Sequence, residues 1–73
     1  MEIDLHGMDV LEAKGYLKDI IEFCDEKELV VIHGGNNGNK IKQMVQRDFK
    51  HKRVKRKIKS LNQGITIFEL EKR

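Results

Sequence analysis

Hydrophobic and polar residues alternate at the start of the chain and then change to a helical spacing. Over residues 2–5 the apolar side chains are Ile3 and Leu5, which predicts a short strand with one buried face. Asp9 followed by Glu12 is typical of a helix N-cap with its capping-box partner, and predicts a helix that runs to about residue 26. The apolar stripe of this helix consists of Val10, Ala13, Leu17, Ile20, Ile21 and Cys24.

The second half of the chain predicts another helix followed by a hairpin. Leu29–Ile32 is apolar without alternation, which indicates a central strand covered on both faces or a strand of a parallel pair. Helical spacing returns from Asn39 with Ile41, Met44, Val45 and Phe49, and this helix runs into a basic segment. Alternation predicts a strand over residues 54–61, and a turn over residues 62–64 leads into a last strand over residues 65–70.

The predicted order of strands and helices is βαβαββ, in a chain of 73 residues that fits a single domain over residues 1–73. A chain of this length buries only about 60% of its unfolded surface, so its core must be small. Short connections join the first strand, the first helix and the second strand, which predicts two parallel strands with a right-handed crossover. The carboxyl ends of these strands should therefore meet at one edge of the sheet.

Two histidines follow the two predicted parallel strands, each directly before a glycine. His6 ends the sequence IDLHG and His33 ends VVIHGG, so we expect both at the shared edge, which we call the rim. Ligands of open α/β sheets bind beyond the carboxyl ends of strands, and Asp4 shares a face with His6. Asp4, His6 and His33 are therefore the candidate catalytic residues. The alternative is that each histidine caps its strand through backbone hydrogen bonds.

A glycine-rich loop, residues 34–38, leads from His33 into the second helix. Its glycines permit positive φ, and exposed N–H groups at the start of a helix bind anions, so the loop suits a phosphate. It lacks the Gly-Lys-Ser/Thr of a P-loop, and such residues are also common turn chemistry. The candidate phosphate-binding residues are Gly34, Gly35, Asn36, Asn37, Gly38 and Lys40.

Charge is distributed unevenly along the chain. The net charge is +3, but residues 50–59 hold seven of the 15 basic residues and no acid, which leaves eight basic residues against 12 acidic ones, or −4, elsewhere. Such a basic segment favours a polyanionic partner, although a solvated face is the plain alternative. The residues expected to contact a nucleic-acid backbone are Lys50, Lys52, Arg53, Lys55, Arg56, Lys57 and Lys59.

The sequence predicts a soluble, cytoplasmic protein that does not enter a membrane. Cys24 is the only cysteine, so an internal disulfide is excluded. The first residues have neither the basic nor the apolar region of a secretory signal, and no apolar run reaches membrane-spanning length. No Cys/His spacing resembles a structural zinc site.

Several motifs of the chain resemble those of the Smr (small MutS-related) domain family. Ile3–Gly7 resembles the family's Leu-Asp-Leu-His-Gly, and Glu12-Ala13 matches the Glu-Ala of its first helix. Ile32–Gly34 with Gly38 resembles its second motif, His/Thr-Gly-Lys-Gly, and Gly64–Leu70 is similar to its last strand. Where the family commonly has Lys then Gly in the second motif, this chain has Gly and Asn.

The resemblance implies an α+β, two-layer fold with a mixed four-stranded sheet and two helices, similar to the C-terminal domain of bacterial initiation factor three. It also implies nucleic-acid binding, and two functions stay open because some members nick DNA or cleave RNA and others act at ribosomes. In an endonuclease assisted by Mg²⁺ or Mn²⁺, His6 or His33 would be the general base, and Asp4 would orient His6 or hold the ion. In a non-catalytic module, the basic segment would dock on ribosomal RNA and protein. DNA and RNA are equally open as partners.

Overall fold

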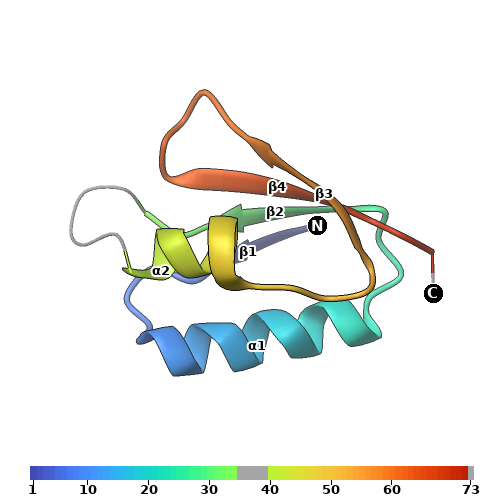
Figure 1. The fold of residues 1–73 in the computed structure, drawn as a ribbon, viewed down its shortest axis with the longest axis horizontal. Coiled ribbons are helices and arrows are strands. Elements are labelled where there is room, and N and C mark those ends of the chain that lie inside the picture. The colour runs from blue at the N-terminus through green and yellow to red at the C-terminus, as the bar shows by residue number, and fades with distance from the viewer. Residues whose placement is uncertain (35–39, 73) are drawn as a thin grey trace.

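The computed structural model describes residues 1–34 and 40–72, and Figure 1 shows their arrangement as a sheet with helices packed against it. The elements are β1 (Glu2–Asp4), α1 (Val10–Phe23), β2 (Glu28–Ile32), α2 (Lys40–Gln43), the π-helical segment η1 (Met44–Asp48), β3 (Val54–Lys59) and β4 (Ile65–Leu70).

The four strands form one mixed sheet in the order β1-β2-β4-β3. β1 and β2 are parallel, with Ile3 opposite Val31, while β4 is antiparallel to both β2 and β3. The predicted parallel pair, the hairpin and the α+β class are confirmed.

The start of α1 follows the predicted capping box. The Asp9 side chain accepts from the Glu12 N–H at 2.8 Å, and the Glu12 carboxylate accepts from the Asp9 N–H at 3.4 Å. The other end differs from the prediction, because α1 ends at Phe23 and Cys24 is extended. The carbonyls of Ile21 and Cys24 are then free to accept from a side chain outside the helix.

The core lies between one face of the sheet and the helices. Its buried residues come from α1 (Ala13, Leu17, Ile21), from the sheet (Ile3, Leu29, Val31, Phe68, Leu70), and from Leu5, Met44, Val45 and Phe49. The predicted stripe of the first helix and the inward Phe49 are thus confirmed, and Cys24 packs against this core, half-buried.

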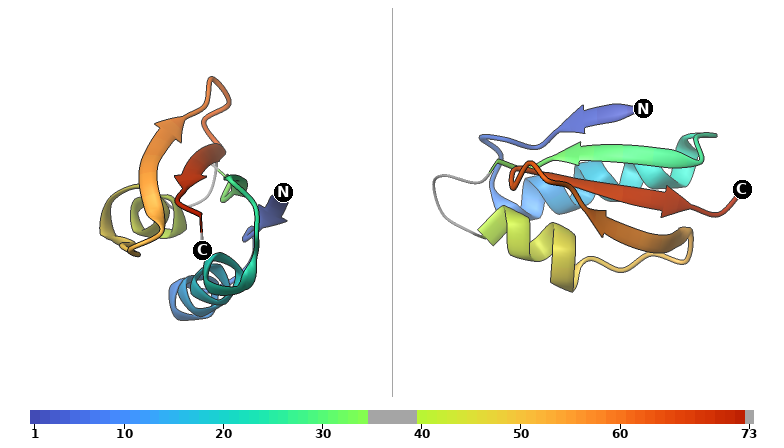
Figure 2. Two further views of the ribbon diagram at one scale, coloured as in Figure 1. Left: turned by 90° about the vertical axis from the view of Figure 1, so that its right-hand side faces the viewer. Right: turned by 90° about the horizontal axis from the view of Figure 1, so that it is seen from above.

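Among residues 1–34 and 40–72, the helices cover one face of the sheet and leave the other uncovered. Leu29 and Val31 of β2 are buried, but Val30 and Ile32 between them stay partly exposed. Of the two interpretations of this apolar run, β2 is therefore a strand of a parallel pair and not a strand covered on both faces. Seen from above in Figure 2, α1 lies behind the strands and no helix crosses in front of β2 and β4. We call this uncovered side the open face.

The second helix changes its winding after one turn. α2 is followed by η1, in which the Phe49 N–H donates to the Met44 carbonyl at 2.7 Å, five residues earlier. The wider turn buries Met44, Val45 and Phe49 together and leaves Asp48, which directly precedes Phe49, at the surface. The predicted helix therefore ends before the basic segment.

Candidate nucleic-acid interface

Three chain segments meet at the rim. The Leu5 N–H donates to the Ile32 carbonyl at 2.7 Å, which extends the β1–β2 pairing to the end of both strands. The N–H groups of His33 and Gly34 both donate to the Gly64 carbonyl, at 2.9 and 3.1 Å, and attach the β3–β4 turn to the same place. The predicted meeting of the strand ends is confirmed.

Gly34 lies directly beside His6. Its φ is +78°, and a Cβ built on it would lie 3.7 Å from Cδ2 of the His6 ring. The imidazole of His6 therefore stands over the first residue of the glycine loop. Gly35, Asn36, Asn37 and Gly38 lie outside the described residues.

Asp4 and His6 are both exposed, and their contact is through the backbone. Oδ1 of Asp4 accepts from the His6 backbone N–H at 2.9 Å. Gly7, with φ of +86°, turns the chain directly afterwards. Asp4 thus holds the turn that presents His6 and contacts its backbone N–H.

His33, in contrast, is buried, with 5% of its surface exposed. Its Nδ1 lies 2.8 Å from the Gly34 carbonyl, and its Nε2 lies 2.8 Å from Oγ1 of Thr66. Because a carbonyl only accepts, Nδ1 carries a proton, and in the neutral ring Nε2 accepts from the Thr66 hydroxyl. Gln46 completes the chain by donating from Nε2 to Thr66 Oγ1 at 2.8 Å. Both ring nitrogens are occupied, which argues against His33 as a general base toward a ligand.

Thr66 and Gln46 were missed from the sequence. Thr66 occupies an inward position of β4, between Ile65 and Ile67 in the chain, and it is fully buried. A polar residue at a core position of an alternating strand is the signal that would have found it, because buried hydroxyl groups need a partner.

The β3–β4 turn is fixed by its own side chains. Oδ1 of Asn62 accepts from the Gly64 N–H at 2.9 Å, and Oγ of Ser60 accepts from the Asn62 N–H at 3.1 Å. A Cβ on Gly64 would lie 3.4 Å from the Gly34 backbone, so glycine permits this close approach. The rim is therefore built on two glycines in contact.

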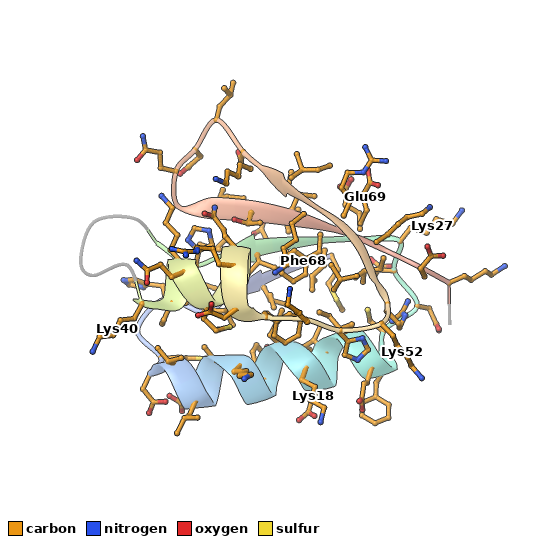
Figure 3. The ribbon with its side chains drawn as sticks, viewed as in Figure 1. Lys18, Lys27, Lys40, Lys52, Phe68 and Glu69 are labelled. Atoms are coloured by element: carbon orange, nitrogen blue, oxygen red, sulfur yellow. The ribbon has the colours of Figure 1, made fainter. Side chains whose placement is uncertain are left out.

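The seven cations of the basic segment do not form one surface. Alternation along β3 places Arg56 opposite Glu69 on the open face, where its Nε lies 3.3 Å from the Glu69 carboxylate. Lys57 and Lys59 point to the helix side, opposite Phe68 and Thr66. The cations that stay exposed are Lys50, Lys52, Lys55, Arg56 and Lys59, together with Lys40 at the start of α2. Figure 3 shows Lys40 and Lys52 at opposite ends of the molecule.

The side chain of Arg53 is buried and hydrogen-bonded within the fold, with 6% of its surface exposed. Its Nη1 donates to the carbonyls of Ile21 and Cys24, and its Nε and Nη2 donate to the Glu71 carbonyl at 3.0 and 2.8 Å. This guanidinium caps the last turn of α1, which has no basic residue of its own. The side chain of Arg53 is therefore not available to the predicted nucleic-acid interface.

The side chain of Lys57 also contacts other parts of the protein. Its Nζ donates to the Phe49 carbonyl at 2.6 Å and lies 5.5 Å from the centre of the Phe68 ring. Burial lowers the pKa of Lys57, the positive charge of Lys50 lowers it further, and Asp48 acts in the opposite direction. This ammonium is better placed to hold the end of η1 than to contact a phosphate.

The donor set at the rim does not fit a metal ion. Among residues 1–34 and 40–72 no group of three or more His, Cys, Asp or Glu side chains is arranged to hold one. Asp4 is the carboxylate of the rim, and one of its oxygens already holds the His6 turn.

Comparison with known proteins agrees with this fold and with the motifs at the rim. The sequence model of the Smr domain matches residues 3–67. The crystal structure of the Smr domain of Thermus thermophilus MutS2 has a TM-score of 0.85 to this chain and covers 96% of each chain, at 23% sequence identity. A search of curated proteins found no match. Within the part of the chain that the structure describes, no helix is long and apolar enough to cross a membrane. Because the family's model matches most of its length, the chain belongs to the Smr domain family.

Proposed function

We propose that this Smr domain binds nucleic acid along β3 and at the rim. The observation that carries the proposal is the acid-free segment of residues 50–59, which ends near the rim and keeps Lys50, Lys52, Lys55, Arg56 and Lys59 exposed. Lys52 lies at one end of the molecule, and Lys59 pairs with Thr66, the residue that contacts His33. The Smr motifs support the same function. Binding should be mainly electrostatic, because residues 50–59 contain seven cations and no Phe, Tyr or Trp on which a base could stack.

The length of β3 sets the expected number of contacts. Its six residues span about 20 Å, which is about six phosphate spacings along one strand of a duplex. Side chains alternate between the two faces of β3, so the exposed cations cannot all reach the phosphates of one strand. We therefore expect about four phosphate contacts in total. The slope of log K against log salt should then be about −3.6 for duplex DNA and about −2.8 for a single strand.

Fluorescence anisotropy with labelled duplex DNA and single-stranded RNA of matched length tests this. Lys59→Ala should make the slope shallower by about one contact, whereas Lys18→Ala, an exposed cation of α1, should leave it unchanged. A slope near zero, or equal effects of both variants, would remove the proposal. Single-stranded DNA of the same sequence as the RNA, measured beside it, decides between DNA and RNA.

If the domain cleaves what it binds, His6 is the base that the geometry favours. It is exposed and stands beside Gly34, whereas both nitrogens of His33 are already bonded. His6 would accept a proton from water or from a ribose hydroxyl next to a phosphate held at the loop. Supercoiled plasmid with added or withheld Mg²⁺ or Mn²⁺ tests this. Nicking by the wild type and by Lys18→Ala, lost in His6→Ala, supports the role, and nicking unchanged in His6→Ala contradicts it.

A non-catalytic ribosome-binding module is the second candidate. The observation that favours it is the small number of catalytic groups at the rim. The exposed groups described there are the imidazole of His6 and the carboxylate of Asp4, and this carboxylate already accepts from the His6 backbone N–H. Co-sedimentation with ribosomal subunits that survives moderate salt, and is lost when Lys52 and Lys59 are both replaced by Ala, would support it. No co-sedimentation at low salt would count against it.

We also propose that residues 1–73 act as one domain in the cytoplasm. The ends of the chain are tied to the fold, because the Met1 amine lies 3.2 Å from the Glu26 carboxylate and the Glu71 N–H donates to the Arg53 carbonyl at 2.7 Å. Limited proteolysis that leaves a nearly full-length core would support the single domain, and a stable shorter core would contradict it.

A further inference from the structure

A pocket lies at the end of the molecule where Lys52 stands, away from Lys40 and the rim (Figure 3). Its walls come from the last turn of α1, from the segment that precedes β3, and from the two residues that follow β4. The pocket has a volume of about 510 Å³, and small-ligand sites have volumes of about 300–1,000 Å³. We call it the end pocket.

Phe23 gives the end pocket an aromatic wall. It is the last residue of α1, and 70% of its surface is exposed. Single apolar side chains are common on protein surfaces, but this one lines a pocket. Exposed aromatic rings stack on planar groups, and every nucleic-acid base has a planar face. The aromatic ring that residues 50–59 lack is therefore supplied by α1, beside the start of the basic segment.

A second wall of the end pocket is polar and held in place by its neighbours. Nδ1 of His51 accepts from the Arg53 N–H at 3.1 Å, and the imidazole stacks on the ring of Phe49 with the two planes inclined by 8°. Nε2 of His51 lies 3.8 Å from a carboxylate oxygen of Glu22. The Glu22 side chain is 42% exposed, so its carboxylate can also accept from N–H groups at the edge of a base.

The charges around the end pocket favour a neutral group inside it and phosphates beside it. Lys52 and Lys72 line the pocket and are exposed. Two carboxylates, Glu22 and Glu71, line it as well, so a phosphate inside the pocket would meet like charge. A base carries no net charge, and the phosphates on either side of it can stay at the two lysines.

We propose that the end pocket takes up one unpaired base of a single-stranded nucleic acid. The base stacks on Phe23, and its neighbouring phosphates contact Lys52 and Lys72. This inference rests on the proposed function, because Lys52 belongs to the segment assigned to the nucleic-acid backbone. A base within a duplex is paired and stacked, and its removal from the stack costs energy. The end pocket therefore gives the domain a preference for single strands, which phosphate contacts alone do not supply.

A tryptophan in place of Phe23 tests the stacking directly. The chain has no tryptophan, so Phe23→Trp introduces a single fluorophore and keeps an aromatic ring in the wall. Binding of a single-stranded oligonucleotide should quench its fluorescence, whereas an abasic strand of the same length and backbone should not. Leu11→Trp, at an exposed position near the start of α1, should respond to neither strand. Binding of the base-bearing strand without quenching in Phe23→Trp, or equal quenching by both strands, would overturn the proposal.

Affinity separates the end pocket from the proposed function. In fluorescence anisotropy Phe23→Ala should weaken binding of the base-bearing strand about tenfold and leave binding of the abasic strand unchanged. Leu11→Ala should alter neither affinity, and circular dichroism should show that both variants remain folded, because both side chains are exposed. Equal affinity of Phe23→Ala and the wild type for the base-bearing strand would overturn the end pocket and leave the proposed function standing. A wild-type chain that binds neither strand nor duplex would overturn both.

Discussion

Replacement of Arg53 by alanine should destabilise the domain far more than any other change in the basic segment. Its guanidinium donates to three carbonyls, two at the end of α1 and one just after β4, at Glu71. Arg53→Ala removes the cap of the helix and the link between the helix layer and the last strand. The aliphatic stem of a nearly buried side chain is lost at the same time.

The magnitude follows from the number of bonds lost. A hydrogen bond to a charged group contributes about 1.5–3 kcal/mol, but bonds from one guanidinium are not additive, so we expect a loss of about 3 kcal/mol in the free energy of unfolding. Domains of this size have about 4–11 kcal/mol in total. The midpoint of thermal unfolding should therefore fall by about 12–24 °C. Arg53→Lys should lose about half as much, because one ammonium cannot reach both ends of this contact set.

Urea denaturation followed by circular dichroism measures the loss, with Lys52→Ala as the matched control. Lys52 is the adjacent, exposed cation, and its replacement should change stability by less than about 0.5 kcal/mol. Nucleic-acid affinity should show the reverse order, reduced in Lys52→Ala and unchanged in folded Arg53→Ala. A loss below about 1 kcal/mol for Arg53→Ala, or a fall in affinity greater than that of Lys52→Ala, would refute the structural role assigned to Arg53.

Three further predictions concern the rim and the helix side of β3. Thr66→Val leaves the Nε2 of His33 and the amide of Gln46 without their partner, so urea denaturation should show a loss of about 1–3 kcal/mol that Thr66→Ser largely avoids. Gly34→Ala must adopt a φ of +78°, which should cost about 1–2 kcal/mol in the same assay, while Gly15→Ala in α1 should not destabilise the domain. Because burial lowers the pKa of Lys57, the folded chain binds fewer protons there than the unfolded chain. Stability should therefore rise as pH increases from below the lowered pKa toward the ordinary value of 10.5, and Lys57→Met should flatten that rise in urea titrations at several pH values.

Local patterns predicted most of the fold, because their causes are local. The capping box of Asp9 and Glu12 involves residues three apart, and the turn at Asn62 and Gly64 involves residues two apart. The parallel pairing of β1 and β2 followed from the short connections that join a strand, a helix and a second strand. Such features need no knowledge of the rest of the chain.

The roles of individual cations could not be predicted, because their partners are distant in the sequence. Arg53 is bonded to carbonyls 18 to 32 residues away, and nothing in the run of lysines around it marks it as different. Lys57 was likewise equivalent to Lys59 until β3 placed its ammonium near the end of η1. The change from α2 to η1 has a similar cause, since the π turn is stabilised by the joint burial of Met44 and Phe49.

The same limit applies to the two His-Gly pairs of the chain, because His6 is exposed and His33 is buried. His6 and His33 each follow a parallel strand and precede a glycine with positive φ, so the sequence gives no reason to separate them. Their strands differ in position: β1 is at the edge of the sheet, and its histidine ends in solvent, whereas β2 is central and its end is enclosed by β4 and the β3–β4 turn. His33 is therefore bonded to Thr66, while His6 is exposed beside Gly34, where we propose that it contacts a ligand. Variants of the two should separate accordingly, with His33→Ala lowering stability and His6→Ala acting on the ligand alone.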